Sequence, residues 1–155
     1  MKMIELYPAG QSFTVGQKHF TAESIIRFAT KFDPQPFHMD EEAARSYVFG
    51  ALCASGWQTC AEWMRCFVDY WAAESARMMQ EGVAPPKLGP SPGFKDLQWL
   101  KPVYAGDTIT YTVTMLESRP LASRPGWILN HSRNEGTNQN GEPVMRFTAS
   151  LLEFE

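Results

Sequence analysis

The sequence predicts an α+β fold in which a strand and two short helices precede one long helix and about four mostly antiparallel strands. Apolar residues at three- and four-residue steps predict the long amphipathic helix over 57–80. Alternating β-branched residues in the last third predict the strands. The dipeptide Asn140-Gly141, between two of these strands, predicts a type I′ hairpin turn. Such a sheet is able to wrap around a central helix. The length of 155 residues suits one domain over 1–155.

The first third of the chain alternates extended and helical patterns. QSFTVGQKHF, residues 11–20, predicts a short strand or hairpin. Thr21 then has the hydroxyl of a helix N-cap, and the helix that follows must stop ahead of Pro34. Asp40 is a second N-cap candidate, for a short helix over 41–46 with two glutamates in its first turn. The helix dipole favours negative charge at that position.

Between these helices, FDPQPFHMD (residues 32–40) places an acid and a histidine five residues apart. On an α-helix this step turns the side chains about 140° apart, and on a strand they fall on opposite faces. The prolines on both sides of Gln35 exclude a helix interior, because each lacks an N–H and crowds the preceding turn. We therefore predict a shaped loop, where Asp33 and His38 could meet as a structural hydrogen bond or as a catalytic pair.

The start of the long helix has the features of an anion-binding site. SGWQ, residues 55–58, fits the capping-box pattern, with Ser55 as the N-cap. Gly56 would be the first helical residue, with a free N–H at the positive end of the helix dipole. Without a side chain, it would let a ligand approach this donor, as in an oxyanion hole. The alternative is a plain helix start after a tight turn, where alanine would be harmless or slightly stabilising.

The region after the long helix predicts a loop and then strands. EGVAPPKLGPSPG, residues 81–93, is rich in the proline and glycine that interrupt regular structure. The predicted strands cover residues 94–104 with a break near Pro102, then 108–116, 126–135 and 143–155.

Composition excludes several classes of protein. A net charge of −3 and a pI of about 5.6 argue against a general nucleic-acid binder. No apolar run approaches the roughly 18 residues of a membrane span, and the N-terminus lacks the apolar core of a secretory signal. Cys53, Cys60 and Cys66 form an odd set that fits a reducing cytoplasm and buried side chains. No cysteine or histidine spacing indicates a metal site.

Three segments carry a resemblance to a known family: FDPQPFHMDEEAA, FGALCASGW and SPGFKDLQWLKPVYAGDT. They resemble, in this order, the MaoC-like dehydratases, which include the (R)-specific enoyl-CoA hydratases. The resemblance implies a hot-dog fold, with a curved antiparallel sheet wrapped around a long central helix, and a homodimer or higher even oligomer. It also implies that Asp33 and His38 are catalytic and that the Gly56 amide binds the thioester carbonyl. Ser55 and Gln35 are expected beside the substrate.

The activity implied is hydration of enoyl thioesters, or the reverse dehydration of 3-hydroxyacyl thioesters. The substrate would be carried by CoA or an acyl carrier protein, and no cofactor is expected beyond the CoA of the substrate. The sequence departs from the commonest hydratase pattern, since Phe32 stands in place of glycine and Gln35 in place of asparagine. Met64 lies near the level where some hydratases carry a serine. Two alternatives are an acyl-CoA thioesterase and a non-catalytic acyl-binding subunit, and the Asp33–His38 pair weighs against the second.

Overall fold

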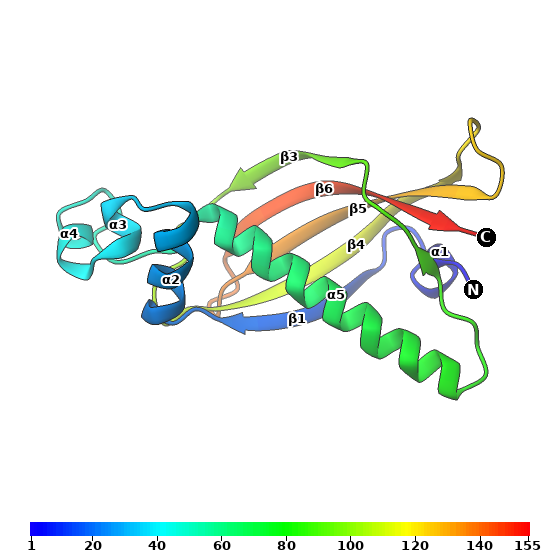
Figure 1. The fold of residues 1–155 in the computed structure, drawn as a ribbon, viewed down its shortest axis with the longest axis horizontal. Helices are drawn as coiled ribbons and strands as arrows, with labels where there is room; N and C mark the ends of the chain where they lie inside the picture. Colours follow the sequence, from blue (N-terminus) through cyan, green and yellow to red (C-terminus); the bar gives the residue numbers. More distant parts are fainter.

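A computed structural model describes residues 1–155 as a curved antiparallel sheet with one long helix lying along it (Figure 1). The helices are α1 (Met3–Leu6), α2 (Ala22–Phe32), α3 (Pro36–Met39), α4 (Glu41–Arg45) and α5 (Gly56–Gln80). The strands are β1 (Ser12–His19), β2 (Lys87–Leu88), β3 (Gly93–Trp99), β4 (Thr108–Pro120), β5 (Trp127–Thr137) and β6 (Pro143–Phe154). The predicted α+β class is confirmed, and the predicted order of elements holds with three short additions, α1, α3 and β2.

The sheet has six strands in the order β1-β4-β5-β6-β2, and β3 also pairs with β6. All the pairings are antiparallel. In Figure 1, α5 crosses the curved sheet, and α2, α3 and α4 gather beyond one end of it, beside the start of α5. This is the hot-dog fold that the sequence predicts. None of the helices combines the length and hydrophobicity needed to cross a bilayer.

The core lies between α5 and the concave face of the sheet. The helix buries side chains at the spacing of one face, and β4 buries alternate residues opposite them. These core residues are Trp63, Cys66, Trp71 and Met78 from α5, and Ile109, Tyr111, Val113 and Met115 from β4. The Tyr111 hydroxyl also donates a hydrogen bond of 2.8 Å to the Thr59 carbonyl oxygen. This bond ties the first turn of α5 to the sheet and so fixes the end of the helix where the candidate site lies.

Both predicted N-caps before α5 are confirmed. The Thr21 hydroxyl accepts a hydrogen bond from the Ser24 N–H at the start of α2. The Asp40 carboxylate accepts one from the Ala43 N–H at the start of α4, with a distance of 2.8 Å. These caps fix the ends of the short helices on either side of the Asp-to-His segment.

Three local predictions need correction. The hairpin at Asn140-Gly141 exists, but its turn is not type I′, because Gly141 has a φ of 74° and Asn140 has no positive φ. The side-chain oxygen of Asn138 instead accepts hydrogen bonds from the Asn140 and Glu142 amides and stabilises a longer turn. The loop over 81–93 also contains β2, which pairs with the end of β6.

The third correction concerns the segment that carries the histidine. Its second half is not a loop, because α3 begins at Pro36. Proline is well tolerated there, since the N–H of the first helical residue has no partner within the helix. The prolines therefore exclude a helix interior, as predicted, but one of them starts a single helical turn.

Candidate active site

Asp33 and His38 meet in the structure. Asp33 is the C-cap of α2, and His38 lies on α3 one short turn later. Gln35 has an extended backbone between them, with φ −78° and ψ 142°, and it reverses the chain direction. His38 Nε2 consequently lies 3.3 Å from Asp33 Oδ2. The proline-shaped segment thus joins two side chains that neither a continuous helix nor a strand could bring together.

The other ring nitrogen of His38 determines the tautomer of its neutral ring. Nδ1 lies 2.6 Å from the carbonyl oxygen of Cys53. Because a carbonyl oxygen only accepts hydrogen bonds, Nδ1 carries the proton and donates it. Neutral His38 therefore presents an unprotonated Nε2 to the Asp33 carboxylate. In this tautomer Nε2 and Asp33 Oδ2 are two acceptors 3.3 Å apart, and a water beside them can donate a hydrogen to either.

The environment of Asp33 keeps its side chain ionised. Partial burial raises the pKa of Asp33, but hydrogen bonds from Gln35 and Ser55 and the charge interaction with His38 together outweigh it. The net pKa of Asp33 is lowered from the ordinary value of 3.8. Gln35 Nε2 donates to Asp33 Oδ1 at 2.7 Å, leaving the Oδ2 atom free to face His38. Gln35, predicted to lie beside the substrate, therefore also orients the carboxylate.

The start of α5 has the predicted cap without the full capping box. Ser55 is the N-cap, and its Oγ accepts a hydrogen bond of 3.3 Å from the Trp57 N–H. The reciprocal half of the box is missing, because the buried Oε1 of Gln58 has no hydrogen-bond partner. Gly56 is the first helical residue, and its N–H has no acceptor in the protein. A free donor thus stands at the positive end of a 25-residue helix.

Trp99 is the residue of this region that sequence reasoning missed. Its indole Nε1 donates a hydrogen bond of 3.0 Å to the Gly56 carbonyl oxygen. A Cβ built on Gly56 would lie 2.6 Å from this Nε1, closer than Cβ atoms come to other atoms in proteins. Alanine at position 56 would therefore not be harmless even at a plain helix start, because the glycine makes room for the Trp99 ring. The signal available in the sequence was its position, a tryptophan near the point where Pro102 interrupts a predicted strand.

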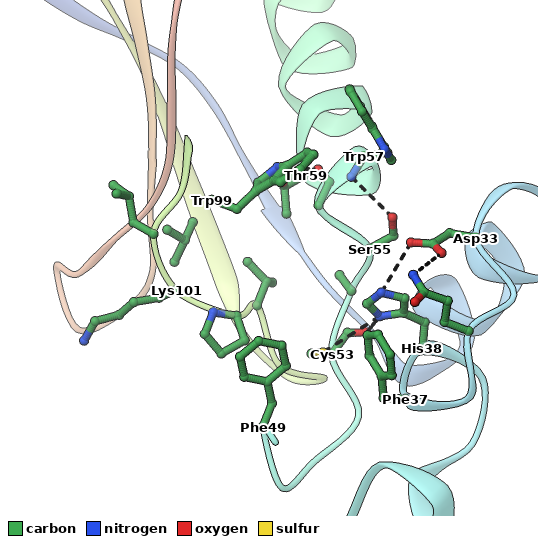
Figure 2. Close-up of a pocket in the computed structure, with 17 residues that line it drawn as sticks. Asp33, Phe37, His38, Phe49, Cys53, Ser55, Trp57, Thr59, Trp99 and Lys101 are labelled. Atoms are coloured by element: carbon green, nitrogen blue, oxygen red, sulfur yellow. Dashed lines mark hydrogen bonds and ion pairs between the residues drawn. The ribbon is translucent and has the colours of Figure 1, made fainter. Parts of the chain in front are cut away.

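All five predicted residues line one cavity of about 400 Å³. Figure 2 shows the Asp33–His38 pair and Ser55 on one side of this cavity and Trp99 across from them. The polar residues are Asp33, Gln35, His38 and Ser55, with the Gly56 backbone beside them, and the apolar wall includes Phe37, Phe49, Trp57, Trp99, Pro102 and Val103. The cavity therefore combines a proton-accepting pair, a free backbone donor and an apolar lining.

The cysteines offer no nucleophile to this site. Cys53 and Cys66 are buried, and Cys60 is half-buried. Burial raises the pKa of the Cys53 thiol to about 11, although its sulfur lies 3.8 Å from His38 Nδ1. The thiolate, which is the reactive form, is therefore scarce at neutral pH. Nowhere do three His, Cys, Asp or Glu side chains gather as metal ligands would.

The fold and the cavity define a class: a hot-dog protein whose acid–histidine pair shares one cavity with the start of its central helix. The family model described as MaoC like domain matches residues 8–125. Since this match covers more than half of the chain, the protein belongs to the MaoC-like domain family.

Individual relatives agree with this assignment. The MaoC-like dehydratase from Rhodospirillum rubrum is 35% identical in sequence, with a TM-score of 0.80 over 98% of this chain and 96% of that one. The uncharacterized protein YdeM from Bacillus subtilis is 29% identical over 126 residues, which is 81% of each chain. The R-hydratase PhaJ1 from Pseudomonas aeruginosa is 19% identical, with a TM-score of 0.62 over 92% of this chain and 79% of that one. At that identity the likeness shows the shared fold alone.

Proposed function

We propose that the protein is an enoyl-thioester hydratase that also runs in the direction of 3-hydroxyacyl-thioester dehydration. The observation that carries the proposal is the pair of proton acceptors, Asp33 Oδ2 and His38 Nε2, 3.3 Å apart in the same cavity as the free Gly56 N–H. Membership of the MaoC-like family supports the same reaction class.

In the proposed reaction the Gly56 amide donates to the thioester carbonyl oxygen. This donor stabilises negative charge on that oxygen and makes the β-carbon of the enoyl group electrophilic. A water held by Asp33 and His38 attacks the β-carbon through its oxygen, and one O–H bond of the water breaks as the C–O bond forms. The double-bond electrons move toward the carbonyl, and the acid–histidine pair takes the proton.

The second half of the reaction returns a proton to the substrate. The α-carbon of the enolate accepts it on the face where water was added, which gives net syn addition. Water has then been split between the two carbons, and the Asp33–His38 pair is restored. A histidine beside a carboxylate suits such proton transfers near neutral pH. Dehydration of the 3-hydroxyacyl thioester follows the same steps in reverse.

The proposed carrier of the acyl group is CoA, with acyl carrier protein as the other thioester. Solved structures with the same fold include an (R)-hydratase from A. caviae and a 3R-hydroxyacyl-ACP dehydratase complex from Mycobacterium tuberculosis. Their names support the reaction class, and the second names acyl carrier protein as the carrier. The chain needs no cofactor for this chemistry beyond the thioester group itself.

A screen of enoyl and 3-hydroxyacyl thioesters of varied length tests the proposal. Hydration removes the absorbance of the conjugated enoyl thioester without releasing a thiol, and we expect this result for at least one enoyl-CoA. Thiol release at the same rate would instead identify a thioesterase. Binding of acyl-CoA with neither change would identify a non-catalytic acyl-binding subunit. Either of these two outcomes would reject hydration as the function.

A further inference from the structure

We propose that Trp99 restricts the substrate to short acyl groups, because its indole separates the catalytic cavity from an apolar groove along α5. The inference rests on the proposed function, since it names the acyl class that the same site accepts. We use the name apolar groove for two adjoining hollows whose lining includes Trp63, Met64, Phe67, Val68, Phe94 and Phe147.

The apolar groove lies between α5 and the strands β3 and β6. It consists of two adjoining hollows of about 390 Å³ and 130 Å³. The hollows share four lining residues, Trp63, Met64, Phe94 and Phe147. Most of the residues that line them are hydrophobic. The groove therefore suits a hydrocarbon chain and offers little to the amides of a pantetheine arm.

The groove and the catalytic cavity meet at a pair of tryptophans. Trp57 lines both the smaller hollow and the catalytic cavity. Trp99 lines the catalytic cavity alone and packs against Trp57 edge-to-face, with ring centroids 5.0 Å apart. The two rings therefore stand at the boundary between the two spaces, and Figure 2 shows them at the start of α5.

The Trp99 ring is held in this position rather than free to swing aside. Its Nε1 donates to the Gly56 carbonyl oxygen, and its ring occupies the space that a side chain at position 56 would need. Moving the ring would break this hydrogen bond and its edge-to-face contact with Trp57. A substrate chain would have to provide that free energy before it could enter the apolar groove.

The proposed chemistry fixes where the acyl chain begins. With its carbonyl oxygen on the Gly56 N–H and its β-carbon at the Asp33–His38 pair, the acyl group starts beside Trp99. The first carbon atoms of the acyl group lie in the catalytic cavity, and a chain directed from there along α5 meets the indole. Without the indole, each further methylene could be buried in the apolar groove, which strengthens binding about fourfold per methylene.

The test compares butyryl-CoA with octanoyl-CoA, which are saturated and bind without turnover. For the wild-type protein, calorimetry should show that octanoyl-CoA binds no more tightly than butyryl-CoA. For Trp99→Ala, the affinity for octanoyl-CoA should rise on the order of 10²-fold relative to the affinity for butyryl-CoA. The gain comes from the four additional methylenes that the apolar groove would bury. In Trp99→Ala, hydration of the eight-carbon enoyl-CoA should likewise become faster relative to hydration of the four-carbon enoyl-CoA. Trp99→Leu is the second variant if Trp99→Ala does not fold.

Two further variants test whether the acyl chain binds in the apolar groove. Met64 lines both hollows of the apolar groove, so Met64→Trp should abolish the gain in the Trp99→Ala background and change little in the wild type. Trp127→Ala removes a tryptophan away from the site, where Trp127 packs edge-to-face against Phe154, and should leave the chain-length preference unchanged.

The inference and the proposed function fail separately. A wild-type preference for octanoyl-CoA, or an unchanged preference in Trp99→Ala and Trp99→Leu, would overturn the role of Trp99 even if hydration is observed. Absence of hydration would overturn the proposed function, and the binding comparison would still decide whether Trp99 closes the groove.

Discussion

At the residue scale, the ionisation of Asp33 depends on Gln35. The amide of Gln35 donates to the carboxylate and helps hold the pKa of Asp33 below 3.8. Gln35→Met keeps the length of the side chain without the donor, so the pKa of Asp33 should rise. An NMR titration of the carboxyl carbon measures this directly, and Gln17→Met, at an exposed position on β1, is the control. An unchanged or lower pKa in Gln35→Met would contradict the role given to Gln35.

The same pKa has a consequence for stability. Because the folded-state pKa of Asp33 is lowered, its interactions stabilise the fold above the ordinary pKa of 3.8. This contribution is lost as pH falls through the folded-state pKa. In both proteins the loss begins near the unfolded-state pKa, but in Gln35→Met it should be smaller and complete at a higher pH than in the wild-type protein.

Much of the candidate site could be predicted from residues close together in the sequence. Two prolines around Gln35 were enough to predict a shaped connection, and a serine–glycine step before an apolar repeat was enough to predict a helix start. Trp99 could not be predicted, because it reaches Gly56 across 43 positions of the chain. The hydrogen bond from His38 to Cys53 was missed for the same reason, since it spans 15 positions.

At the scale of an element, the first turn of α5 provides the proposed oxyanion donor. Gly56→Pro removes that N–H, and proline is favoured at the first position of a helix. Ser55 has a ψ of 137°, which a following proline allows. Gly56→Ala is the matched control, because both substitutions add a Cβ against Trp99 and only proline removes the donor.

Both variants are best compared in the Trp99→Leu background, which relieves the crowding at position 56. We expect hydration of crotonyl-CoA to be lower in the proline variant than in the alanine variant by on the order of 10²–10³-fold. Equal rates in the two folded variants would show that the Gly56 N–H does not bind the substrate.

Regular elements were easier to predict than the turns that join them. The period of apolar residues predicted α5 almost to its ends, since Ser55 caps it and the glycine- and proline-rich segment ends it. At Asn140-Gly141 the dipeptide predicted a type I′ turn, but the Asn138 side chain satisfies the backbone of a longer turn instead. Such competition between side chain and backbone depends on geometry that a dipeptide does not specify.

At the scale of the whole molecule, we expect a homodimer or a multiple of it. The edge strand β3 pairs only with β6, so its outer edge is free to pair with a second chain. A free strand edge of this kind presents unpaired backbone groups, which favours pairing between copies of a chain. Sedimentation at low micromolar concentration should show at least twice the chain mass of 17.5 kDa. A single species of 17.5 kDa would contradict this prediction.

The central claim is that Asp33 and His38 together activate the water that adds to an enoyl thioester. Its most direct test is the rate of enoyl-absorbance loss with the best thioester from the screen, for wild-type protein, Asp33→Asn and His38→Ala. Each substitution should lower kcat/KM for hydration by about 10²–10⁴-fold, the usual effect of losing a general acid or base. Circular dichroism should show both variants folded. Near wild-type turnover by either purified variant would contradict the account.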